Sequence, residues 1–511
     1  MKSSGNTAFR SYVEVLLDQL DKRADRTVLR YLDKDVSGSA LRASIYRHAR
    51  ALAALGVGRG SLVALFAPNC PEALAVRYAA NLLGAASIFL PAITSAQHRA
   101  AFLARLQPTL LVAFAQTAYL VPDGIDVRTV YVGMGRAGTR LDLLAQMQSE
   151  LPVHSGAQPD DLAVIVSSGG STGMPKASRR SFAGYSTMVS APSPADRRQL
   201  VNGALAYLSQ VLVDNTLMGG GTVVLKPFYD AADTLATIEA ERITDLLLVE
   251  PQLFETMDHA DVERRDLSSL RSIAHIGGSA PAILRRRAIA RLGLVLTHLY
   301  GASEAGLVSM LTPADYRFDP DLLASAGRIR PGVQVRIRRA DGTLALPGQA
   351  GSIEVKSAAV AHGYHHQPAD SARKFRGEWC VMGDIGFIDA QRNLHVLGRA
   401  VDVAPINGVE TGPTQIESPL CALPEVRYAV AVATDDIARE PIWNVVVVPW
   451  PGKRIDMPRC MRALEQVFGV NIAHTVQMVA AQRVPLTEQG KVDRVAIARM
   501  CDAAGSMRCA A

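Results

Sequence analysis

Residues 164–177 read VIVSSGGSTGMPKA, the most informative segment of the chain. An apolar strand leads into seven small residues, 167–173, and Pro175 and Lys176 follow them. Glycine allows the backbone to turn tightly and to approach a ligand closely. Consecutive N–H groups and hydroxyls can donate hydrogen bonds to phosphate oxygens, and Lys176 adds a positive charge. The segment therefore indicates a phosphate-binding loop at the end of a strand.

Three other interpretations compete on these residues alone. A Walker A loop requires Gly-Lys-Ser/Thr at its end, and it is excluded because Pro175 precedes the lysine. Residues 169–173 fit the G-x-S-x-G elbow of a serine hydrolase with Ser171 as nucleophile, although no downstream Asp and His stand out as partners. The third interpretation is a flexible Gly/Ser-rich surface loop.

The chain around this loop alternates helix-like and strand-like segments. Residues 40–55 (ALRASIYRHARALAAL) carry apolar positions at helical spacing and end at glycine, and residues 61–67 (SLVALFA) form a short apolar run. Similar runs follow at 222–225 (TVVL), 245–249 (DLLLV) and 292–296 (LGLVL). Helices interleaved with short apolar strands predict an α/β fold with parallel sheets covered on both faces.

The pattern changes after about residue 325. VQVRIRRADG at 333–342 and GSIEVKS at 351–357 alternate like hairpin strands and predict a small β-rich subdomain. A segment with glycine and proline at 398–413 precedes a final α+β unit with strand-like AVAVA and WNVVVV. We therefore expect a large N-terminal domain over 1–399 and a small C-terminal domain over 400–511.

Composition narrows the function classes. A chain of 511 residues is too long for one compact core. The charge of +6 is spread along the chain and does not indicate nucleic-acid binding; the cluster 285–287 is most simply a solvated helix face, or else a patch for a phosphorylated ligand. Six cysteines without CxxC spacing suggest neither disulfides nor zinc. No long apolar run and no signal-peptide pattern are seen, so a cytoplasmic protein is expected.

The loop SSGGSTGMPKA resembles the signature loop of the adenylate-forming superfamily, which includes acyl- and aryl-CoA synthetases, peptide-synthetase adenylation domains and firefly luciferase. The family pattern is Thr-Ser-Gly-Ser/Thr-Thr-Gly-x-Pro-Lys-Gly. Ser168, Gly169 and Ala177 depart from it. The matching residues are Gly170, Ser171, Thr172, Gly173, Pro175 and Lys176.

Further motifs of that family follow in the same order. Residues 275–281 (HIGGSAP) resemble its Gly-Gly-Ala/Ser-Pro turn, and residues 300–304 (YGASE) resemble its Tyr-Gly-x-Thr-Glu motif. Gly363-Tyr364, Trp379, Gly383-Asp384 and Gly398-Arg399 resemble the elements up to the hinge. Residues 485–494 (PLTEQGKVDR) match the Pro-x-Thr-x-x-Gly-Lys-x-x-Arg motif near the family's C-terminus.

The resemblance implies a role for each motif. Lys491 would lower the charge barrier between a carboxylate and ATP, and Glu304 would bind Mg²⁺. Catalytic roles are expected for Lys491, Thr172 and Glu304. Tyr300 would stack on adenine, Ser303 would contact the α-phosphate, and Asp384 with Arg399 would hold the ribose. Nucleotide contacts are expected from Ser167, Ser168, Gly169, Gly170, Ser171, Thr172, Gly173, Lys176, Gly278, Ser279, Ala280, Tyr300, Gly301, Ala302, Ser303, Asp384 and Arg399.

The implied activity has two steps. ATP and a carboxylic acid form acyl-AMP with release of pyrophosphate, and the acyl group then passes to a thiol after the mobile C-terminal domain rotates. The expected acceptor is coenzyme A rather than the phosphopantetheine of a separate carrier protein. A homodimer is one arrangement that the sequence leaves open. A degenerate member that binds nucleotide without turnover is the alternative, and the serine hydrolase with Ser171 ranks last.

Two departures from the family pattern bear on the substrates. Val401 and Pro405 replace the charged residue and the lysine of the family's hinge motif, so a stiffer hinge is expected. The sequence therefore supports the adenylation step more strongly than the thioester-forming step. Ala204 and Leu205 stand where many CoA ligases have Phe-His, and Tyr207 stands near the aspartate that binds an amino acid's ammonium in peptide synthetases. An aliphatic, aryl or modified carboxylic acid is therefore favoured over a free α-amino acid.

Overall fold

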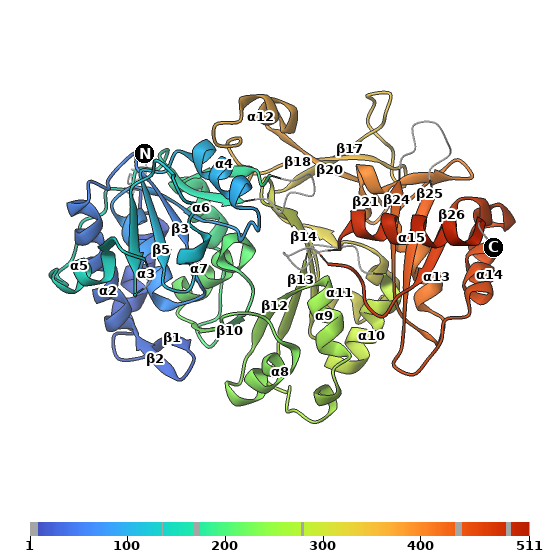
Figure 1. Ribbon diagram of the computed structural model, residues 1–511, viewed down its shortest axis with the longest axis horizontal. Helices are drawn as coiled ribbons and strands as arrows, with labels where there is room; N and C mark the ends of the chain where they lie inside the picture. Colours follow the sequence, from blue (N-terminus) through green and yellow to red (C-terminus); the bar gives the residue numbers. More distant parts are fainter. Residues whose placement is uncertain are drawn as a thin grey trace, which may run out of the picture.

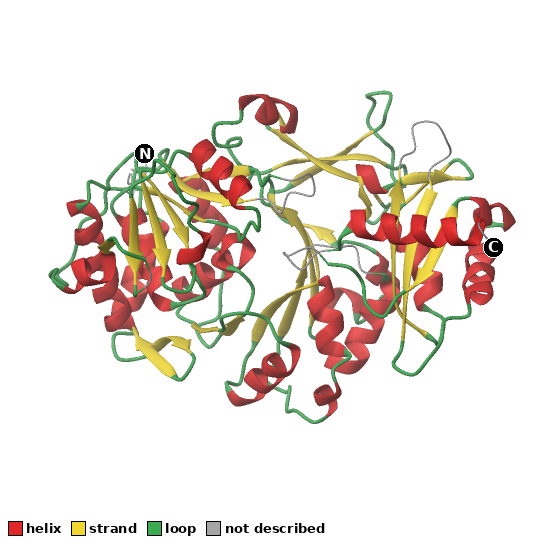
Figure 2. Cartoon of the chain, in the orientation of Figure 1, coloured by secondary structure: helices red, strands yellow, loops and turns green. Residues whose placement is uncertain are grey.

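The computed structural model describes residues 9–134, 136–167, 174–276, 281–434, 442–486 and 492–509. Its N-terminal elements lie at the left of Figure 1, its C-terminal elements at the right, and the middle of the chain between them. Sheets with many parallel strand pairs are flanked by helices (Figure 2), which confirms the α/β fold class.

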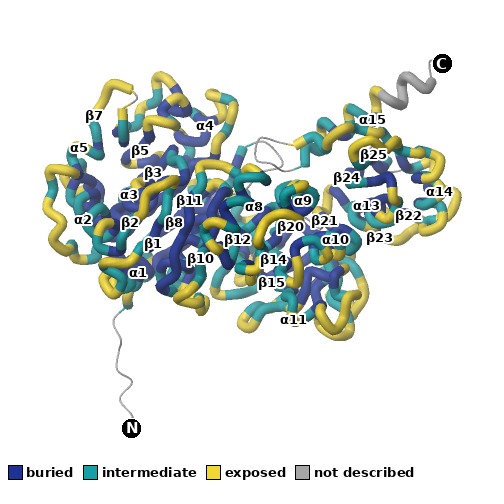
Figure 3. The backbone as a smooth tube through the Cα atoms, turned by 90° about the horizontal axis from the view of Figure 1, so that it is seen from below, coloured by how far each residue is buried: buried dark blue, intermediate teal, exposed yellow. Residues whose placement is uncertain are grey.

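A seven-stranded sheet carries the segment that leads into the predicted phosphate loop. Its spatial order is β7 (Thr139–Arg140), β6 (Thr129–Val132), β5 (Leu110–Phe114), β3 (Leu62–Phe66), β4 (Ala86–Phe89), β8 (Leu162–Ser167) and β9 (Ala177–Ser181). The strands pair in parallel except for β8 and β9, which pair antiparallel. β8 is almost fully buried (Figure 3), in keeping with the continuous apolar run LAVIV.

A nine-stranded sheet carries the Tyr-Gly-x-Ser-Glu motif. Its order is β16 (Arg328–Ile329), β15 (Gly306–Leu311), β14 (Leu296–Ala302), β13 (Ser272–Ile276), β12 (Asp245–Val249), β10 (Arg198–Val201), β11 (Thr222–Leu225), β1 (Thr27–Tyr31) and β2 (Lys34–Ser37). The strand predicted over 292–296 is wrong, because Leu292 ends α10 (Ala282–Leu292) and β14 begins only at Leu296. Gly293, at φ +87°, ends that helix.

The β-rich part expected after residue 325 is a five-stranded antiparallel sheet of β17 (Gln334–Arg338), β18 (Gly351–Lys356), β20 (Trp379–Ile388), β19 (Phe375–Arg376) and β21 (Leu394–Arg399). After Arg399 come the hairpin β22 (Ala404–Ile406) and β23 (Val409–Thr411), and a sheet of β24 (Val426–Thr434), β25 (Ile442–Pro449) and β26 (Val476–Ala480). β21 thus ends at the residue where the sequence suggested a domain boundary, which itself stays a prediction.

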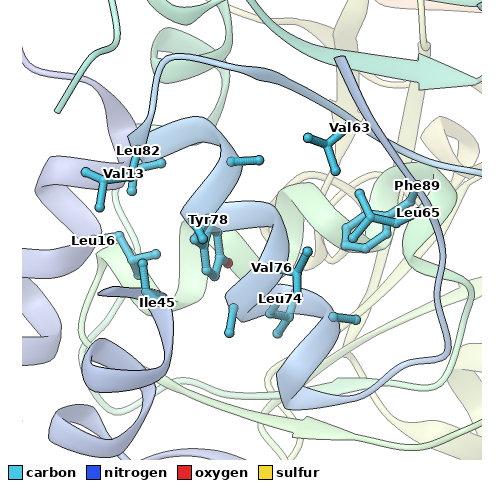
Figure 4. Packing of buried hydrophobic residues seen from close by; sticks show 14 of the residues in the cluster. Val13, Leu16, Ile45, Val63, Leu65, Leu74, Val76, Tyr78, Leu82 and Phe89 are labelled. Atoms are coloured by element: carbon cyan, nitrogen blue, oxygen red, sulfur yellow. The ribbon is translucent and has the colours of Figure 1, made fainter. Parts of the chain in front are cut away.

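The helices of the first half surround the two parallel-containing sheets. α3 is buried along almost its whole length, and Figure 4 shows its Leu74, Val76 and Tyr78 packed between neighbouring elements. Proline at its first position suits an N-terminus, where no N–H partner is needed. These helices are α1 (Tyr12–Lys22), α2 (Gly38–Ala54), α3 (Pro71–Leu82), α4 (Ala96–Leu106), α5 (Leu141–Gln146), α6 (Phe182–Val189), α7 (Gln210–Met218), α8 (Ala231–Ala240) and α9 (Glu250–Met257).

The C-terminal elements share one apolar cluster with α9, α10 and their strands. At this contact Oδ2 of Asp258, which follows α9, accepts hydrogen bonds from Arg287 of α10 at 3.0 Å and from Arg427 of β24 at 2.9 Å. The guanidinium of Arg287 also lies 4.8 Å from the ring centroid of Trp450. The remaining helices are α11 (Pro313–Tyr316), α12 (Pro368–Lys374), α13 (Pro413–Cys421), α14 (Met457–Phe468) and α15 (Arg494–Cys509).

The structure also describes the apolar character of the helices and the state of the cysteines. Among the helices that the structure describes, none is long and apolar enough to cross a membrane. Five cysteines are buried free thiols: Cys70, Cys380, Cys421, Cys460 and Cys501.

Candidate active site

The predicted phosphate loop connects the paired strands β8 and β9. Ser167, the last residue of β8, lies opposite Ala177, the first residue of β9. The Ser167 hydroxyl is buried and has no hydrogen-bond partner among the described residues. Ser168, Gly169, Gly170, Ser171, Thr172 and Gly173 lie outside the described residues.

Lys176 follows the loop and contacts α12. Its Nζ lies 3.5 Å from Oδ1 of Asp370 and 5.2 Å from the ring centroid of Tyr364. The Lys176 side chain is a little over one-third exposed. The structure therefore places a cation at the end of the loop and beside the Gly-Tyr motif.

Tyr300, Gly301 and Ala302 end β14, and Ser303 and Glu304 lie in the turn to β15. The turn is tight, because a Cβ on Gly301 would lie 2.3 Å from the carbonyl oxygen of Gly306. Only glycine fits at that position. The motif thus presents Ser303 and Glu304 at the end of an otherwise regular strand pair.

The Glu304 carboxylate is held on both oxygens. Tyr364 donates a hydrogen bond to Oε1 at 2.6 Å, and Ser303 donates one to Oε2 at 2.8 Å. Burial raises the pKa of Glu304, but the Lys374 ammonium and the two hydrogen bonds outweigh burial, so the pKa lies below its usual range. Glu304 is therefore a fixed, ionised carboxylate at neutral pH.

A second carboxylate, Asp384, faces the same motif. Tyr300 donates its phenol to Oδ2 of Asp384 at 2.6 Å, and Arg399 places Nε 3.2 Å from Oδ1. Asp384 on β20 and Arg399 on β21 are register partners, so the sheet itself aligns them. Burial and the Asp384 charge raise the pKa of Tyr300 well above its ordinary value. The predicted ribose pair and Tyr300 are thus assembled together.

Other predicted site residues lie outside the described residues, namely Gly278, Ser279, Ala280 and Lys491. Their flanking residues are described. β13 ends at Ile276 and α10 starts at Ala282, on either side of the Gly-Gly-Ser turn. Leu486 bridges Val492 across the Lys491 segment, and Arg494 forms an ion pair with Asp402 in the hinge region.

Sequence reasoning missed two groups around Glu304. Lys374 contributes a charge that stabilises the carboxylate, and Arg180 of β9 donates to the carbonyl oxygen of Ser303 at 2.7 Å. Alternation along 177–181 shows that Arg179 and Arg180 point to opposite faces, and Arg179 is the exposed one. That pattern was available from the sequence, but the acceptors of a buried arginine come from distant segments.

The residues present fit a magnesium ion bound with a triphosphate. Glu304 is a hard, ionised oxygen ligand. The buried hydroxyl of Ser167, at the start of the loop that ends at Lys176, has no hydrogen-bond partner within the described ranges. No group of three or more His, Cys, Asp and Glu side chains in the described part of the chain could hold a metal alone. Magnesium typically keeps waters and uses one or two carboxylates plus phosphates.

Comparison with known proteins agrees with this arrangement. Residues 16–365 match the AMP-binding enzyme family. The chain is 30% identical to an indoleacetate–CoA ligase of Aromatoleum aromaticum over 91% of this chain and 93% of that protein. It is 27% identical to a medium/long-chain fatty-acid–CoA ligase of Mycobacterium tuberculosis over 96% of this chain and 90% of that protein.

A solved structure extends the likeness to the whole fold. The amide bond synthetase McbA of Marinactinospora thermotolerans superposes with a TM-score of 0.84 and 27% identity, over 96% of this chain and 99% of that chain. Three observations indicate the same family: the order of the motifs, the geometry around Glu304 and Asp384, and these similarities. This chain belongs to the AMP-binding enzyme family, within the adenylate-forming superfamily that its motifs predicted.

Proposed function

We propose that this enzyme is an acid–thiol ligase that activates a carboxylic acid with ATP and transfers the acyl group to coenzyme A. In the first step a carboxylate oxygen attacks the α-phosphorus, the α–β phosphoanhydride breaks, and pyrophosphate leaves. In the second step the thiol attacks the acyl carbon, and AMP leaves. The observation that carries the proposal is Glu304, buried and ionised between Tyr364 and Ser303 on the turn that also bears Tyr300.

The site residues divide between the two ends of ATP. We assign the β- and γ-phosphates to the loop 167–173 and Lys176. Adenine is assigned to Tyr300 and the turn 278–280, and the ribose hydroxyls to Asp384 with Arg399. Asp384 retains acceptor capacity beyond its bonds to Tyr300 and Arg399, since an ionised carboxylate offers about four lone-pair sites.

Charge neutralisation is the main chemical task, because a carboxylate must approach a triphosphate. Glu304 would hold Mg²⁺, which when bound neutralises phosphate charge. Lys176 adds a cation at the loop exit. The Ser303 hydroxyl donates to Glu304 in this structure and would have to rotate to donate to the α-phosphate. We assign Lys491 to the acid carboxylate and the α-phosphate, where its ammonium stabilises charge that develops in the transition state.

We further propose that residues 1–399 and 400–511 are separate domains joined by a hinge. Arg399 ends β21, and a short 3₁₀ turn, Ala400–Asp402, follows before β22. The Asp402–Arg494 ion pair connects this segment to the first residue of α15, three positions after Lys491. A rotation about this segment would therefore move Lys491 away from the nucleotide.

The acid is proposed to be apolar, either aliphatic or aryl. The acyl pocket predicted near residue 205 falls on the π-helical turn Leu205–Ser209, in which Leu205 and Ala206 are buried. π-helical turns occur frequently at functional sites. The two relatives named above act on a fatty acid and on indoleacetate, both of which lack an α-ammonium group.

The buried free thiols support a reducing, cytoplasmic location.

A second candidate acceptor is an amine. It is favoured by the similarity to the amide bond synthetase and by Pro405 of β22, which stands where the family's hinge motif commonly has a lysine. In this version the same acyl-AMP forms, and the amine nitrogen attacks the acyl carbon with loss of AMP and a proton.

Product analysis tests both candidates. The chain is incubated with ATP, Mg²⁺, a panel of acids, and either coenzyme A or a primary amine, and products are identified by mass spectrometry. AMP together with an acyl thioester supports the first candidate, and AMP together with an amide supports the second. ADP as the nucleotide product, or no acid-dependent AMP with any acid, contradicts both. Glu304→Gln should abolish the product formed by the wild type.

A further inference from the structure

Arg180 is a buried cation on the strand that leaves the phosphate-binding segment. It lies on β9, four residues after Lys176 and opposite Val164 of β8, and only 2% of its surface is exposed. Burial lowers the pKa of its guanidinium to about 10, which still leaves it charged at neutral pH. Burying a charge is costly unless the charge is hydrogen-bonded and compensated by its surroundings.

The acceptors of Arg180 belong to two segments that hold Glu304. Nη2 donates to the carbonyl oxygen of Ser303 at 2.7 Å, and Nη1 donates to that of Ala359. The Ser303 hydroxyl contacts the Glu304 carboxylate, and the Ala361 amide donates to the Glu304 carbonyl at 2.7 Å. Both hydrogen-bond acceptors are main-chain carbonyls, so Arg180 fixes backbone positions, and the Glu304 charge also attracts its guanidinium.

The backbone of β9 also forms hydrogen bonds with residues 363–365, which include Tyr364. The amide of Arg179 donates to the Gly363 carbonyl at 2.9 Å, and the amide of His365 donates to the Ala177 carbonyl at 2.8 Å. Tyr364, between them, reaches Oε1 of Glu304. Two series of hydrogen bonds therefore connect β9 to Glu304, one through Tyr364 and one through Arg180.

We propose that Arg180 is a positioning residue that sets the separation between Lys176, immediately before β9, and the Glu304 carboxylate. This inference rests on the proposed function, because it assigns the two ends of that separation to the triphosphate and to its Mg²⁺. A guanidinium suits the task since its rigid fork holds two acceptors in fixed directions. A lysine ammonium keeps the charge but not that geometry.

The test compares binding of MgATP with binding of ATP in EDTA by titration calorimetry. Arg180→Met should weaken MgATP binding about tenfold, as expected for loss of hydrogen bonds from a charged donor, and should leave ATP in EDTA nearly unchanged. Arg180→Lys should fall between the wild type and Arg180→Met. In pyrophosphate exchange, the KM for ATP should rise while the KM for the acid stays as in the wild type.

Arg99 of α4 provides a matched control. It is also buried, and it donates to main-chain carbonyls, those of Leu120 at 2.8 Å and of Ile93 and Thr94 at 2.5 Å. Arg99→Met should lower the melting temperature without changing the ratio of the MgATP and metal-free ATP affinities. A change of that ratio in Arg180→Met and not in Arg99→Met supports positioning.

The contradicting outcomes are distinct. Wild-type MgATP affinity in Arg180→Met, or an equal loss with and without the metal, overturns the role of Arg180. Where Arg180→Met fails to fold, wild-type MgATP affinity in Arg180→Lys overturns it. A wild-type chain that binds MgATP but never exchanges pyrophosphate refutes the proposed function, while calorimetry still decides on Arg180. A wild-type chain that does not bind MgATP refutes both.

Discussion

The phenol of Tyr364 donates a 2.6 Å hydrogen bond to Oε1 of Glu304, sixty residues earlier in the chain. This contact joins the Gly-Tyr motif to the Tyr-Gly-x-Ser-Glu motif and places both beside Lys176, whose Nζ lies over the Tyr364 ring. Motifs that are far apart in the sequence therefore form one charged site. The contact also lowers the pKa of Glu304, together with Lys374 and Ser303.

Removing the Tyr364 hydroxyl should move the acid limb of catalysis. In the proposed mechanism Glu304 must be ionised to bind Mg²⁺, and its lowered pKa keeps it ionised as the pH falls. Tyr364→Phe removes one hydrogen bond to the charged form, so the pKa of Glu304 rises and protonation begins at a higher pH. The pH dependence of kcat/KM for ATP in pyrophosphate exchange measures this shift. Tyr316→Phe, which loses a bond to the Leu296 carbonyl, should leave the acid limb in place. An identical acid limb in Tyr364→Phe would contradict the role of that hydroxyl.

Lys491→Ala separates the two proposed half-reactions. Loss of an ammonium that stabilises transition-state charge should slow acyl-AMP formation by about a hundredfold or more. Transfer from a synthetic acyl-adenylate to coenzyme A should persist, because that step does not need Lys491. The measurements are pyrophosphate exchange and thioester formation. Lys453→Ala, at an exposed C-terminal lysine, is the control for both. Wild-type exchange in Lys491→Ala would show that the assignment is wrong.

Asp258 should stabilise the packing of the C-terminal elements on α9 and α10. Its buried carboxylate receives both Arg287 and Arg427, so Asp258→Ala leaves two charges without their acceptor and should cost about 3 kcal/mol in the free energy of unfolding. Asp266→Ala breaks an exposed ion pair with Arg242 and should cost less than about 1 kcal/mol. Urea unfolding of the two variants checks the difference. Equal losses would argue against a structural role for Asp258.

The buried pair His275 and His298 predicts a pH dependence of stability. Their Nδ1 atoms lie 3.1 Å apart, and Arg285 donates to Nε2 of His298 at 3.2 Å, which requires neutral rings. Burial lowers the pKa of His275 to about 3 and that of His298 well below its ordinary value. Unfolded histidines bind protons below about pH 6.5, so stability should fall as the pH drops from there toward 3, by about 1.4 kcal/mol per pH unit for each histidine.

The double variant His275→Gln/His298→Gln tests that dependence. It should show a shallower decline of the unfolding free energy between neutral and acid pH than the wild type. His154→Gln, at an exposed position, should keep the wild-type slope. A double variant with the wild-type slope would mean that these histidines do not contribute to acid unfolding.

Local patterns and the family resemblance together predicted most of the frame of the site. Buried strands appear as apolar runs, so β8 could be placed from its local pattern. The Tyr300–Glu304 turn and the Asp384–Arg399 pair were expected only from the resemblance to the adenylate-forming superfamily. The boundary error at 292–296 has a local cause, because an apolar run after a glycine fits a helix end and a strand start equally well.

Contacts between distant segments could not be predicted in this way. Arg180 is one of two adjacent arginines, and nothing in its neighbours reveals that its acceptors are the carbonyls of Ser303 and Ala359. Asp258 resembles many other aspartates that follow a helix, and its importance comes from arginines on α10 and β24. Such groups are defined by tertiary packing, which pairs residues that have no fixed spacing in the chain.

Isotope exchange between pyrophosphate and ATP tests the central claim most directly. Labelled pyrophosphate is supplied with ATP, Mg²⁺ and each member of a panel of aliphatic and aryl acids. The account predicts that label enters ATP only when a suitable acid is present, and that Glu304→Gln abolishes this incorporation. Incorporation that is independent of any acid, or that persists in Glu304→Gln, would contradict the claim that Glu304 and the segment before Lys176 form the acid-activating site.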